Sequence, residues 1–193
     1  MRAVSHPDPT KLDEQSLIAR FVARRDEGTF REIYRRQTPA LLRIAARLTS
    51  GSTARVDDVV QEVWLRAILA LPRFRYESSF RTWLVGFVVN VTREMLRPRA
   101  DVIPFEALIE EPEAADADPA LLAERDLMPL LRELPEGYRT VLVLHELEGL
   151  THSEIAEVLG ISMGTAKSQL SRARTAIRAR LGAQADGAAG RTS

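Results

Sequence analysis

Side chains that can contact nucleic acid are concentrated in the last third of the chain, in a stretch with helical periodicity. Between residues 163 and 181 the stretch contains five cations and no acid. The cations are Lys167, Arg172, Arg174, Arg178 and Arg180. Lys and Arg suit phosphate or guanine, the amide of Gln169 suits adenine, and Ser can bond to either. This chemistry predicts contact with the major groove of DNA.

Two helices joined by a sharp turn are expected to position these cations. Thr151 and Glu154 form a capping box at the start of the first helix, in which each side chain satisfies a free backbone N–H. Gly160 ends this helix, because glycine adopts the left-handed conformation without strain, and Ser162 can cap the second helix. The apolar residues of the second helix recur at three- and four-residue steps and predict one packed face. They are Ala166, Leu170, Ala173 and Ile177. The pattern indicates a helix-turn-helix.

A basic amphipathic helix can also be an ordinary solvated surface, so the cations alone do not establish DNA binding. The combination of a helix cap, a turn glycine, an apolar side chain at Ile161 and a second helix without acids favours DNA binding over that alternative.

The composition excludes several classes of protein. The 193 residues include 27 basic residues, 27 acidic residues and no cysteine, so disulfides and thiolate metal sites are excluded. His6, His145 and His152 lack the spacing of metal ligands, and we expect no metal or cofactor. There is neither an apolar run of membrane-spanning length nor a signal peptide pattern. We therefore expect a cytoplasmic protein without membrane insertion.

The N-terminal half is predicted to be a helical bundle over residues 13–98, preceded by a flexible tail over residues 1–12. The tail contains two prolines and no helical period. Within the bundle, Val59, Val63 and Trp64 form one packed helical face. The opposite face is mixed polar, which suits either a binding surface or plain solvation.

A polar loop after this helix holds a second set of candidate DNA contacts. Phe74 lies between Arg73 and Arg75, and Tyr76 follows Arg75. An aromatic ring in a cationic loop suits base stacking. Ser78 or Ser79 can cap the helix that follows.

That next helix is expected to face the core with Phe80, Trp83 and Phe87, which leaves the two loop aromatics available to unstacked bases. On another face, polar side chains lie one turn apart. They are Asn90, Arg93 and Arg97. The alternative for Asn90 is a hydrogen bond to a neighbouring helix.

The composition changes between the two halves. Residues 99–120 are rich in acids and contain Pro104 and Pro112, and we expect a flexible linker there whose carboxylates compete with DNA for the cations of the last helix. The predicted fold is all-α, with two small helical domains joined by this acidic linker. The second domain spans residues 121–182, and a flexible tail follows over residues 183–193.

Three stretches of the chain resemble the conserved regions of one protein family. They are DDVVQEVWLRA, FRTWLVGFVVN and LPEGYRTVLVLHELEGLTHSEIAEVLGISMGTAKSQLSRAR. They resemble regions 2 and 4 of the extracytoplasmic function (ECF) sigma factors, bacterial transcription initiation subunits of the sigma-70 superfamily. The resemblance covers residues 15–181 approximately. It implies a region 2 bundle, a region 4 helix-turn-helix, and a protein that binds core RNA polymerase and catalyses no reaction itself.

The resemblance also implies the partners and the residues that contact them. The partners are promoter DNA, the β′ clamp helices and β flap of core RNA polymerase, and an anti-sigma factor. The implied minus-35 contacts are Thr165, Lys167, Ser168, Gln169, Ser171, Arg172 and Arg174. The implied minus-10 and melting contacts are Phe74, Arg75, Tyr76, Ser78, Asn90, Arg93 and Arg97. The implied polymerase contacts are Asp58, Gln61, Glu62, Leu65 and Arg66.

Two positions depart from the family pattern, because Ala166 and Gln169 stand where a β-branched residue and an arginine are usual. They imply a different DNA preference. The alternative function is a stand-alone helix-turn-helix regulator. It would need a dimerisation segment or a sensor domain, and the sequence has no pattern that indicates either.

Overall fold

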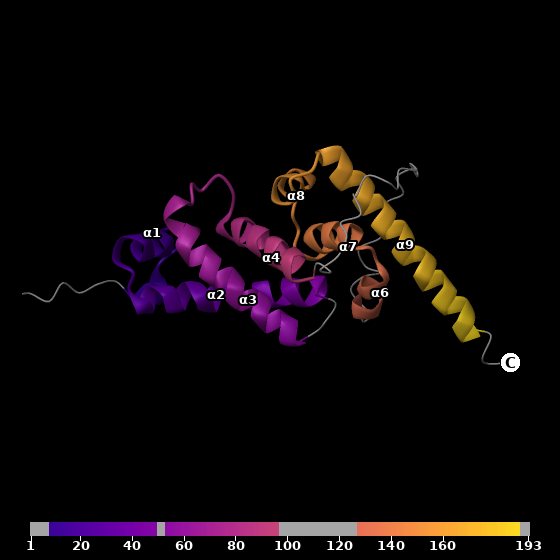
Figure 1. Ribbon diagram of the computed structural model, residues 1–193, viewed down its shortest axis with the longest axis horizontal. Helices are drawn as coiled ribbons and strands as arrows, with labels where there is room; N and C mark the ends of the chain where they lie inside the picture. The colour runs from indigo at the N-terminus through magenta and orange to yellow at the C-terminus, as the bar shows by residue number, and fades with distance from the viewer. Residues whose placement is uncertain (1–7, 50–52, 97–126, 190–193) are drawn as a thin grey trace, which may run out of the picture.

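The computed structural model describes residues 8–49, 53–96 and 127–189, and every element within these ranges is helical (Figure 1). In chain order the elements are η1 (Pro9–Lys11), α1 (Glu14–Arg24), α2 (Glu27–Leu48), α3 (Thr53–Ala70), η2 (Leu71–Arg73), α4 (Phe80–Leu96), α6 (Leu127–Glu133), α7 (Glu136–Leu142), η4 (Val143–Leu147), α8 (His152–Leu159) and α9 (Met163–Ala189). The predicted linker over 99–120, Arg97, and the ends of the chain before residue 8 and after residue 189 lie outside the described residues.

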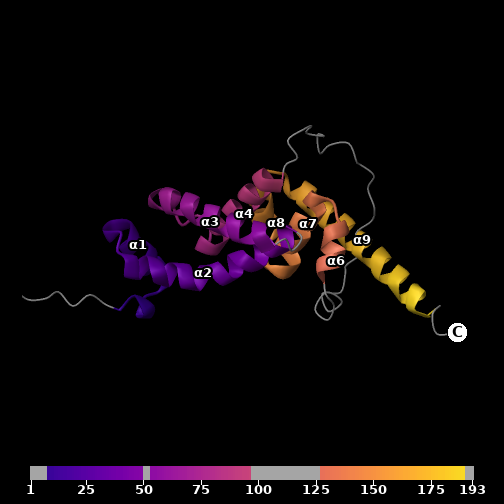
Figure 2. The same ribbon diagram turned by 60° about the horizontal axis from the view of Figure 1, so that its bottom comes forward.

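Helices α1 to α4 form the first bundle (Figure 2). Asp13 and Asp26 cap α1 and α2 by accepting hydrogen bonds from backbone N–H groups three residues later. The predicted core face of α3 is confirmed, because Val59, Val63 and Trp64 are all buried. The indole N–H of Trp64 donates to the Thr38 hydroxyl at 3.1 Å, so this large ring is buried without an unpaired polar group.

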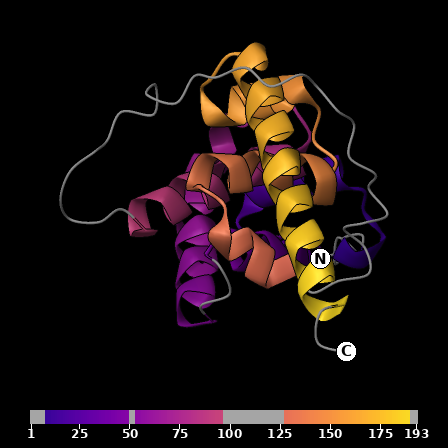
Figure 3. The ribbon, with the colours of Figure 1, turned by 90° about the vertical axis from the view of Figure 1, so that its right-hand side faces the viewer.

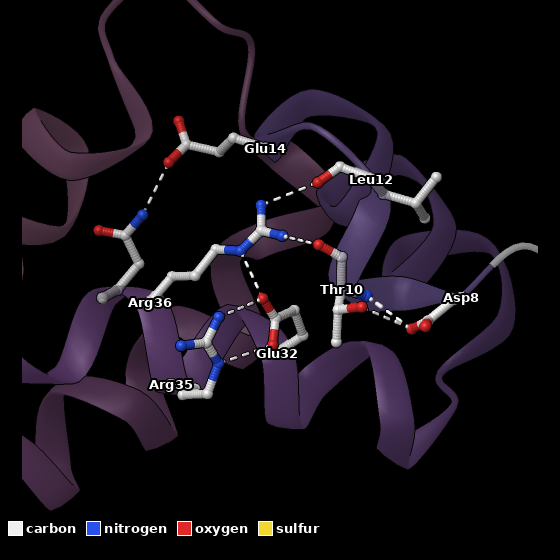
Figure 4. Close-up of polar contacts among 8 residues, drawn as sticks. Asp8, Thr10, Leu12, Glu14, Glu32, Arg35 and Arg36 are labelled. Atoms are coloured by element: carbon white, nitrogen blue, oxygen red, sulfur yellow. Dashed lines mark hydrogen bonds and ion pairs between the residues drawn. The ribbon is translucent and has the colours of Figure 1, made fainter.

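A polar network fixes the start of the chain to α2 (Figure 4). Arg36 donates to the backbone oxygens of Leu12 at 2.8 Å and Thr10 at 2.9 Å. The Glu32 carboxylate holds this guanidinium in place at 2.6 Å and also binds Arg35 at 2.7 Å. Residues 9–11 therefore form a 3-10 turn, and the expectation of a flexible tail extending to residue 12 is wrong for this part.

Helices α6 to α9 form the second bundle, which contains the predicted helix-turn-helix. The capping box is present, since the Thr151 hydroxyl accepts from the Glu154 N–H and the Glu154 carboxylate accepts from the Thr151 N–H. Gly160 ends α8 with a φ of 66°, a left-handed conformation that favours glycine. Figure 3 shows α9 crossing over α7, against which it packs. The helix continues to Ala189, beyond the expected domain end at 182.

The segment before the helix-turn-helix is a single π-helical turn, η4. Its wider spacing is visible in the hydrogen bond from the Glu148 N–H to the Val143 oxygen, five residues earlier, at 3.1 Å. Gly149 follows with a φ of 72°. Turns of this kind frequently occur at functional positions in helical proteins. At this turn two nearby acids bind in different directions: Glu146 pairs with α9, and Glu148 pairs with the first bundle.

The two bundles pack against each other, mainly through α4 and α8 and also through α2 and α7. Their buried apolar residues form one continuous cluster. No helix within the described ranges has both the length and the apolar character that crossing a membrane would require.

The Glu32 network predicts a specific dependence of stability on pH. Hydrogen bonds from Arg35 and then Arg36 lower the pKa of Glu32 from 4.5 to about 2. Because the folded-state pKa is lower than the unfolded value, the stabilisation is complete above pH 4.5 and is lost as the pH falls towards 2. We expect Glu32→Gln to lower the melting temperature at pH 7 and to reduce the further loss between pH 5 and about pH 3, measured by circular dichroism.

Glu27→Gln is the matched control for this prediction. It removes an exposed carboxylate of the same helix, which pairs only with its neighbour Arg31 one turn away. It should keep most of the wild-type pH dependence, because an exposed pair of this kind contributes little. An unchanged acid slope in Glu32→Gln would contradict the assignment.

Candidate nucleic-acid and polymerase interfaces

The N-terminal turn of α9 presents the outward-facing polar side chains of the helix-turn-helix. The Ser162 hydroxyl accepts from the Thr165 N–H at 2.9 Å and caps the helix. Lys167 and Ser168 are exposed, and the Ser168 hydroxyl donates back to the Thr165 oxygen at 3.1 Å. A capped helix start with an adjacent cation suits phosphate as well as base edges.

Gln169 does not lie on this outward face. Its residue is 4% exposed, and its side-chain oxygen has no hydrogen-bond partner within the described part of the chain. The physical reason is helical spacing, because position 169 follows Ala166 by three residues and precedes Ala173 by four, and both are fully buried. The expectation that Gln169 reaches a base is therefore wrong for this arrangement. The helical spacing to Ala166 and Ala173 in the sequence indicates a buried position, whereas the amide side chain indicates a DNA contact.

The two arginines that follow on α9 are held by the protein itself. Arg174 donates twice to the Glu146 carboxylate, at 2.8 and 2.6 Å, and the two side chains are 18% and 8% exposed. Arg172 approaches the Tyr138 hydroxyl at 3.4 Å. Ser171 has a buried hydroxyl oxygen that lacks a hydrogen-bond partner among the described residues. All three of these predicted contacts are half-buried.

A cavity of about 260 Å³ lies on the surface of α4, where that helix meets α8. The lining residues are Ser78, Thr82, Trp83, Gly86, Phe87, Asn90, Glu157 and Val158. The structure therefore brings together two predicted minus-10 residues, Ser78 and Asn90, at one hollow. Glu157 and Val158 come from α8, so the helix-turn-helix forms one wall of this cavity.

A row of aromatic rings leads from the loop into this cavity. The ring centroids of Tyr76 and Phe74 are 4.7 Å apart, those of Phe74 and Trp83 are 5.1 Å apart, and those of Trp83 and Phe87 are 4.8 Å apart. Phe80 is buried at 3% exposure, as expected. Trp83 and Phe87 are partly buried: they pack against the core cluster, as predicted, and they also line the cavity. These two rings therefore border both the core and the surface.

The remaining predicted cations of this surface differ in their surroundings. The Arg75 side chain is 81% exposed and lies 4.0 Å from Glu77. Arg93 lies 3.6 Å from Glu136 of α7. Tyr76 is exposed and has a positive φ of 58°, which is uncommon for a residue with a side chain.

The outer face of α3 is exposed and carries the residues predicted to contact polymerase. Asp58 and Gln61 are exposed, and Leu65 is 55% exposed. Leu69, which was not among the predicted contacts, is 81% exposed one turn after Leu65. The four-residue spacing from Leu65 was the signal that could have identified it. Leu65 and Leu69 thus form a small apolar patch on the outer face of α3.

Arg66 on the same helix is fixed by two acids. It donates to Glu62 at 2.7 Å and to Glu94 of α4 at 2.9 Å. The hydrogen bonds that Arg66 donates to Glu94 and then to Glu62 raise the pKa of its guanidinium. Glu62 and Arg66 thus help to join α3 to α4, in addition to any contact with a partner.

The histidines of the second bundle form a ring pair beside the helix-turn-helix. The centroids of His145 and His152 are 4.6 Å apart, and the Nδ1 atom of His145 lies 2.8 Å from the Leu150 oxygen. Burial, and then the nearby His145, Lys167 and Arg174, lower the pKa of His152. In the part of the chain that the structure describes, no three acids or histidines gather as metal ligands would.

These features define a helical DNA-reading protein, with a helix-turn-helix in one bundle and an aromatic, amide-containing cavity in the other. Comparison with protein families identifies it more closely. Residues 33–101 match the family model described as sigma-70 region 2, and residues 124–177 match the one described as sigma-70, region 4. The chain belongs to the ECF group of the sigma-70 family, and it is a promoter-recognising sigma factor that works with core RNA polymerase.

Curated relatives match nearly their whole length. The chain is 32% identical to the ECF RNA polymerase sigma-E factor of Escherichia coli K12 over 181 residues, covering 86% of this chain and 93% of that protein. It is 31% identical to the RNA polymerase sigma-H factor of Pseudomonas aeruginosa over 182 residues, covering 87% and 93%. The proposal of a stand-alone regulator is therefore not favoured.

Solved structures share the fold. CnrH, solved in complex with the cytosolic domain of CnrY, matches with a TM-score of 0.63 at 27% identity, covering 88% of this chain and 97% of that one. The sigma factor RpoE of Bartonella quintana, solved with the anti-sigma factor NepR, matches with a TM-score of 0.61 at 24% identity, covering 79% and 96%. The all-helical, two-domain fold predicted from the sequence is confirmed.

The buried amide of Gln169 gives a testable prediction. Replacing it with leucine removes an unpaired oxygen from an apolar site, so we expect Gln169→Leu to stabilise the protein by about 1 kcal/mol. The preferred bases of the minus-35 element should stay the same. Thermal unfolding and selection of promoter variants with reconstituted holoenzyme would measure both effects.

Gln61→Leu, at an exposed position, is the control and should give no such gain in stability. A changed base preference would return Gln169 to the DNA surface.

Proposed function

We propose that this sigma factor divides promoter opening among three surfaces, and that the α4 cavity captures an unpaired base of the minus-10 element. The observation that carries the proposal is the meeting of Ser78, Asn90 and the rings of Trp83 and Phe87 around one hollow. Aromatic faces stack on a flipped base, while amide and hydroxyl groups bond to its edge. Phe74 and Tyr76 extend the stacking surface towards the incoming strand.

Promoter melting in this scheme depends on capture of the flipped base. Unstacking a base costs a few kcal/mol, and the stacking and hydrogen bonds in the cavity must offset this cost. Arg75 and Arg93 supply cations for the strand backbone. Arg97 belongs to the same predicted set.

The start of α9 reads the minus-35 element. Thr165, Lys167 and Ser168 provide the outward-facing contacts of that turn, with Arg172 and Ser171 further along the same helix. Arg174 keeps the helix at its angle through Glu146. Phosphate contacts position such a helix, and base-edge contacts give it sequence preference.

The outer face of α3 binds the β′ clamp helices of core polymerase. Asp58 and Gln61 supply polar contacts, and Leu65 with Leu69 supplies the apolar area that makes protein interfaces stable. The second bundle contacts the β flap, and the protein acts in the cytoplasm, where polymerase is found. In this proposal the two domains span residues 13–98 and 121–182, and each domain has a DNA-reading surface.

An anti-sigma factor regulates the chain in this proposal. The support is the likeness to the Bartonella RpoE, which was solved with the anti-sigma factor NepR, and to CnrH, which was solved with the cytosolic domain of CnrY. The match covers 97% of CnrH, which supports a comparable partner surface on this chain.

A pair of variants separates base capture from polymerase binding. Asn90→Ala should reduce open-complex formation by about tenfold or more, because it removes the amide from the cavity, and it should leave binding to core polymerase intact. Leu65→Asp should do the reverse, since it places a charge in the apolar part of the α3 face. Open complexes are measured by permanganate reactivity, and polymerase binding by fluorescence anisotropy.

Met95→Ala is the control for both variants, because Met95 is 40% exposed on α4 and lies outside the cavity lining. Run-off transcription with purified core polymerase supplies the overall readout. Equal losses in both assays for Asn90→Ala and Leu65→Asp would indicate general misfolding and remove the assignment of separate surfaces.

A further inference from the structure

Met163 is an exposed apolar side chain at the start of the DNA-reading helix. It is the first residue of α9 and is 50% exposed. All other large apolar side chains that are exposed in the described ranges belong to the first bundle. A single exposed methionine is ordinary on a protein surface. Its place on α9 gives Met163 a role, because the N-terminal residues of a recognition helix are the ones that contact base edges.

The hydroxyl groups around Met163 are engaged within the protein. The Ser162 and Thr165 hydroxyls bond to each other at 2.9 Å, and the Ser162 hydroxyl also accepts from the Thr165 N–H. The Ser168 hydroxyl donates its proton to the Thr165 backbone oxygen. The long exposed side chains of this segment are then Met163 and Lys167.

Met163 and Lys167 lie four residues apart, so they share one side of α9. They offer different chemistry to the major groove. An ammonium group suits phosphate or guanine, whereas the thioether of methionine is at most a weak acceptor. The apolar group on a major-groove base edge is the methyl at C5 of thymine, and 5-methylcytosine carries the same methyl. A flexible methionine can adapt its shape to such a group.

The burial of Gln169 strengthens the match between Met163 and a methyl group. An amide in the groove could read adenine, but Gln169 is 4% exposed and lies on the packed face of α9. Without that amide, the distinguishing group that remains on an A·T pair is the thymine methyl. Met163 is the exposed apolar side chain of this segment that can contact it.

We propose that Met163 is a specificity-determining residue that recognises the C5-methyl group of one pyrimidine in the minus-35 element. This inference rests on the proposed role of α9 in reading that element. Thymine supplies the methyl in unmodified DNA, and 5-methylcytosine supplies it in methylated DNA. The contact removes apolar surface of both partners from water, which stabilises the complex without a hydrogen bond. Methylation of a cytosine at this position therefore increases the affinity of the sigma factor for its promoter.

A methyl scan of the promoter tests the inference with the full-length protein in reconstituted holoenzyme, on promoters selected with that holoenzyme. Each base pair contains one pyrimidine, so each pair of the minus-35 element is measured with and without a C5-methyl. Thymine is compared with deoxyuridine, and 5-methylcytosine with cytosine, which separates the two sources of the methyl. At one base pair the methylated form should bind about fourfold more tightly, equal to about 0.8 kcal/mol at 1.4 kcal/mol for each tenfold change. Equilibrium competition between fluorescent promoter fragments measures this ratio.

Substitutions at Met163 connect the methyl effect to this side chain. Met163→Ala should bind both forms of the DNA equally, because the apolar contact is lost. Met163→Leu restores an apolar side chain and should keep most of the fourfold ratio. Met95→Ala is the matched control, since it removes an exposed methionine of the first bundle, and it should leave the ratio unchanged. Circular dichroism confirms that each variant is folded.

Two results would overturn the inference. One is a scan in which no C5-methyl changes the affinity of the wild-type holoenzyme, and the other is an unchanged ratio in Met163→Ala. Lys167→Ala distinguishes these results from a failure of the proposed function. It should weaken binding to all forms of the element alike, because a lost phosphate or guanine contact does not depend on the methyl. That loss would keep α9 as the reader of the minus-35 element without a role for Met163, whereas no loss would remove α9 from that role.

Discussion

The arrangement of this protein depends on one buried carboxylate. Glu148 is almost completely enclosed, and it connects Arg47 at the end of α2 with Arg81 in the first turn of α4. A charge in that position would be costly without both partners. The π-helical turn makes the connection possible, because Glu148 faces the first bundle while Glu146, two residues earlier, holds Arg174 of the DNA-reading helix. One short turn therefore positions the recognition helix and the neighbouring bundle.

The same connection explains why the DNA-reading surfaces differ in accessibility. The start of α9 is turned away from the first bundle, and Lys167 and Ser168 remain exposed. The α4 surface faces α8, so the cavity beside Asn90 is bounded by the helix-turn-helix itself. In the proposed function, the exposed turn of α9 reads the upstream element, and the cavity that α4 and α8 form together captures an unpaired base.

Local features were predictable from the sequence, and features that depend on distant residues were not. The capping box of Thr151 and Glu154 and the left-handed Gly160 follow from backbone chemistry within a few residues. The residue type of Gln169 indicates a base contact, whereas its helical spacing from the buried Ala166 and Ala173 indicates the packed face on which the structure places it. The contacts of Glu148 join residues 101 and 67 positions away. Sequence periodicity predicts neither such distant pairs nor the cavity between α4 and α8.

The contact between the bundles combines apolar packing with paired charges. The buried apolar residues of the two bundles form one continuous cluster, and burial of apolar surface contributes about 25 cal/mol for each square ångström. Paired charges contribute little net stability, because the gain in attraction is offset by the loss of hydration. They still fix one geometry, since the Glu148 carboxylate must meet both guanidinium groups. The apolar cluster therefore supplies most of the stability of the contact, and the ion pairs determine how the two bundles are oriented.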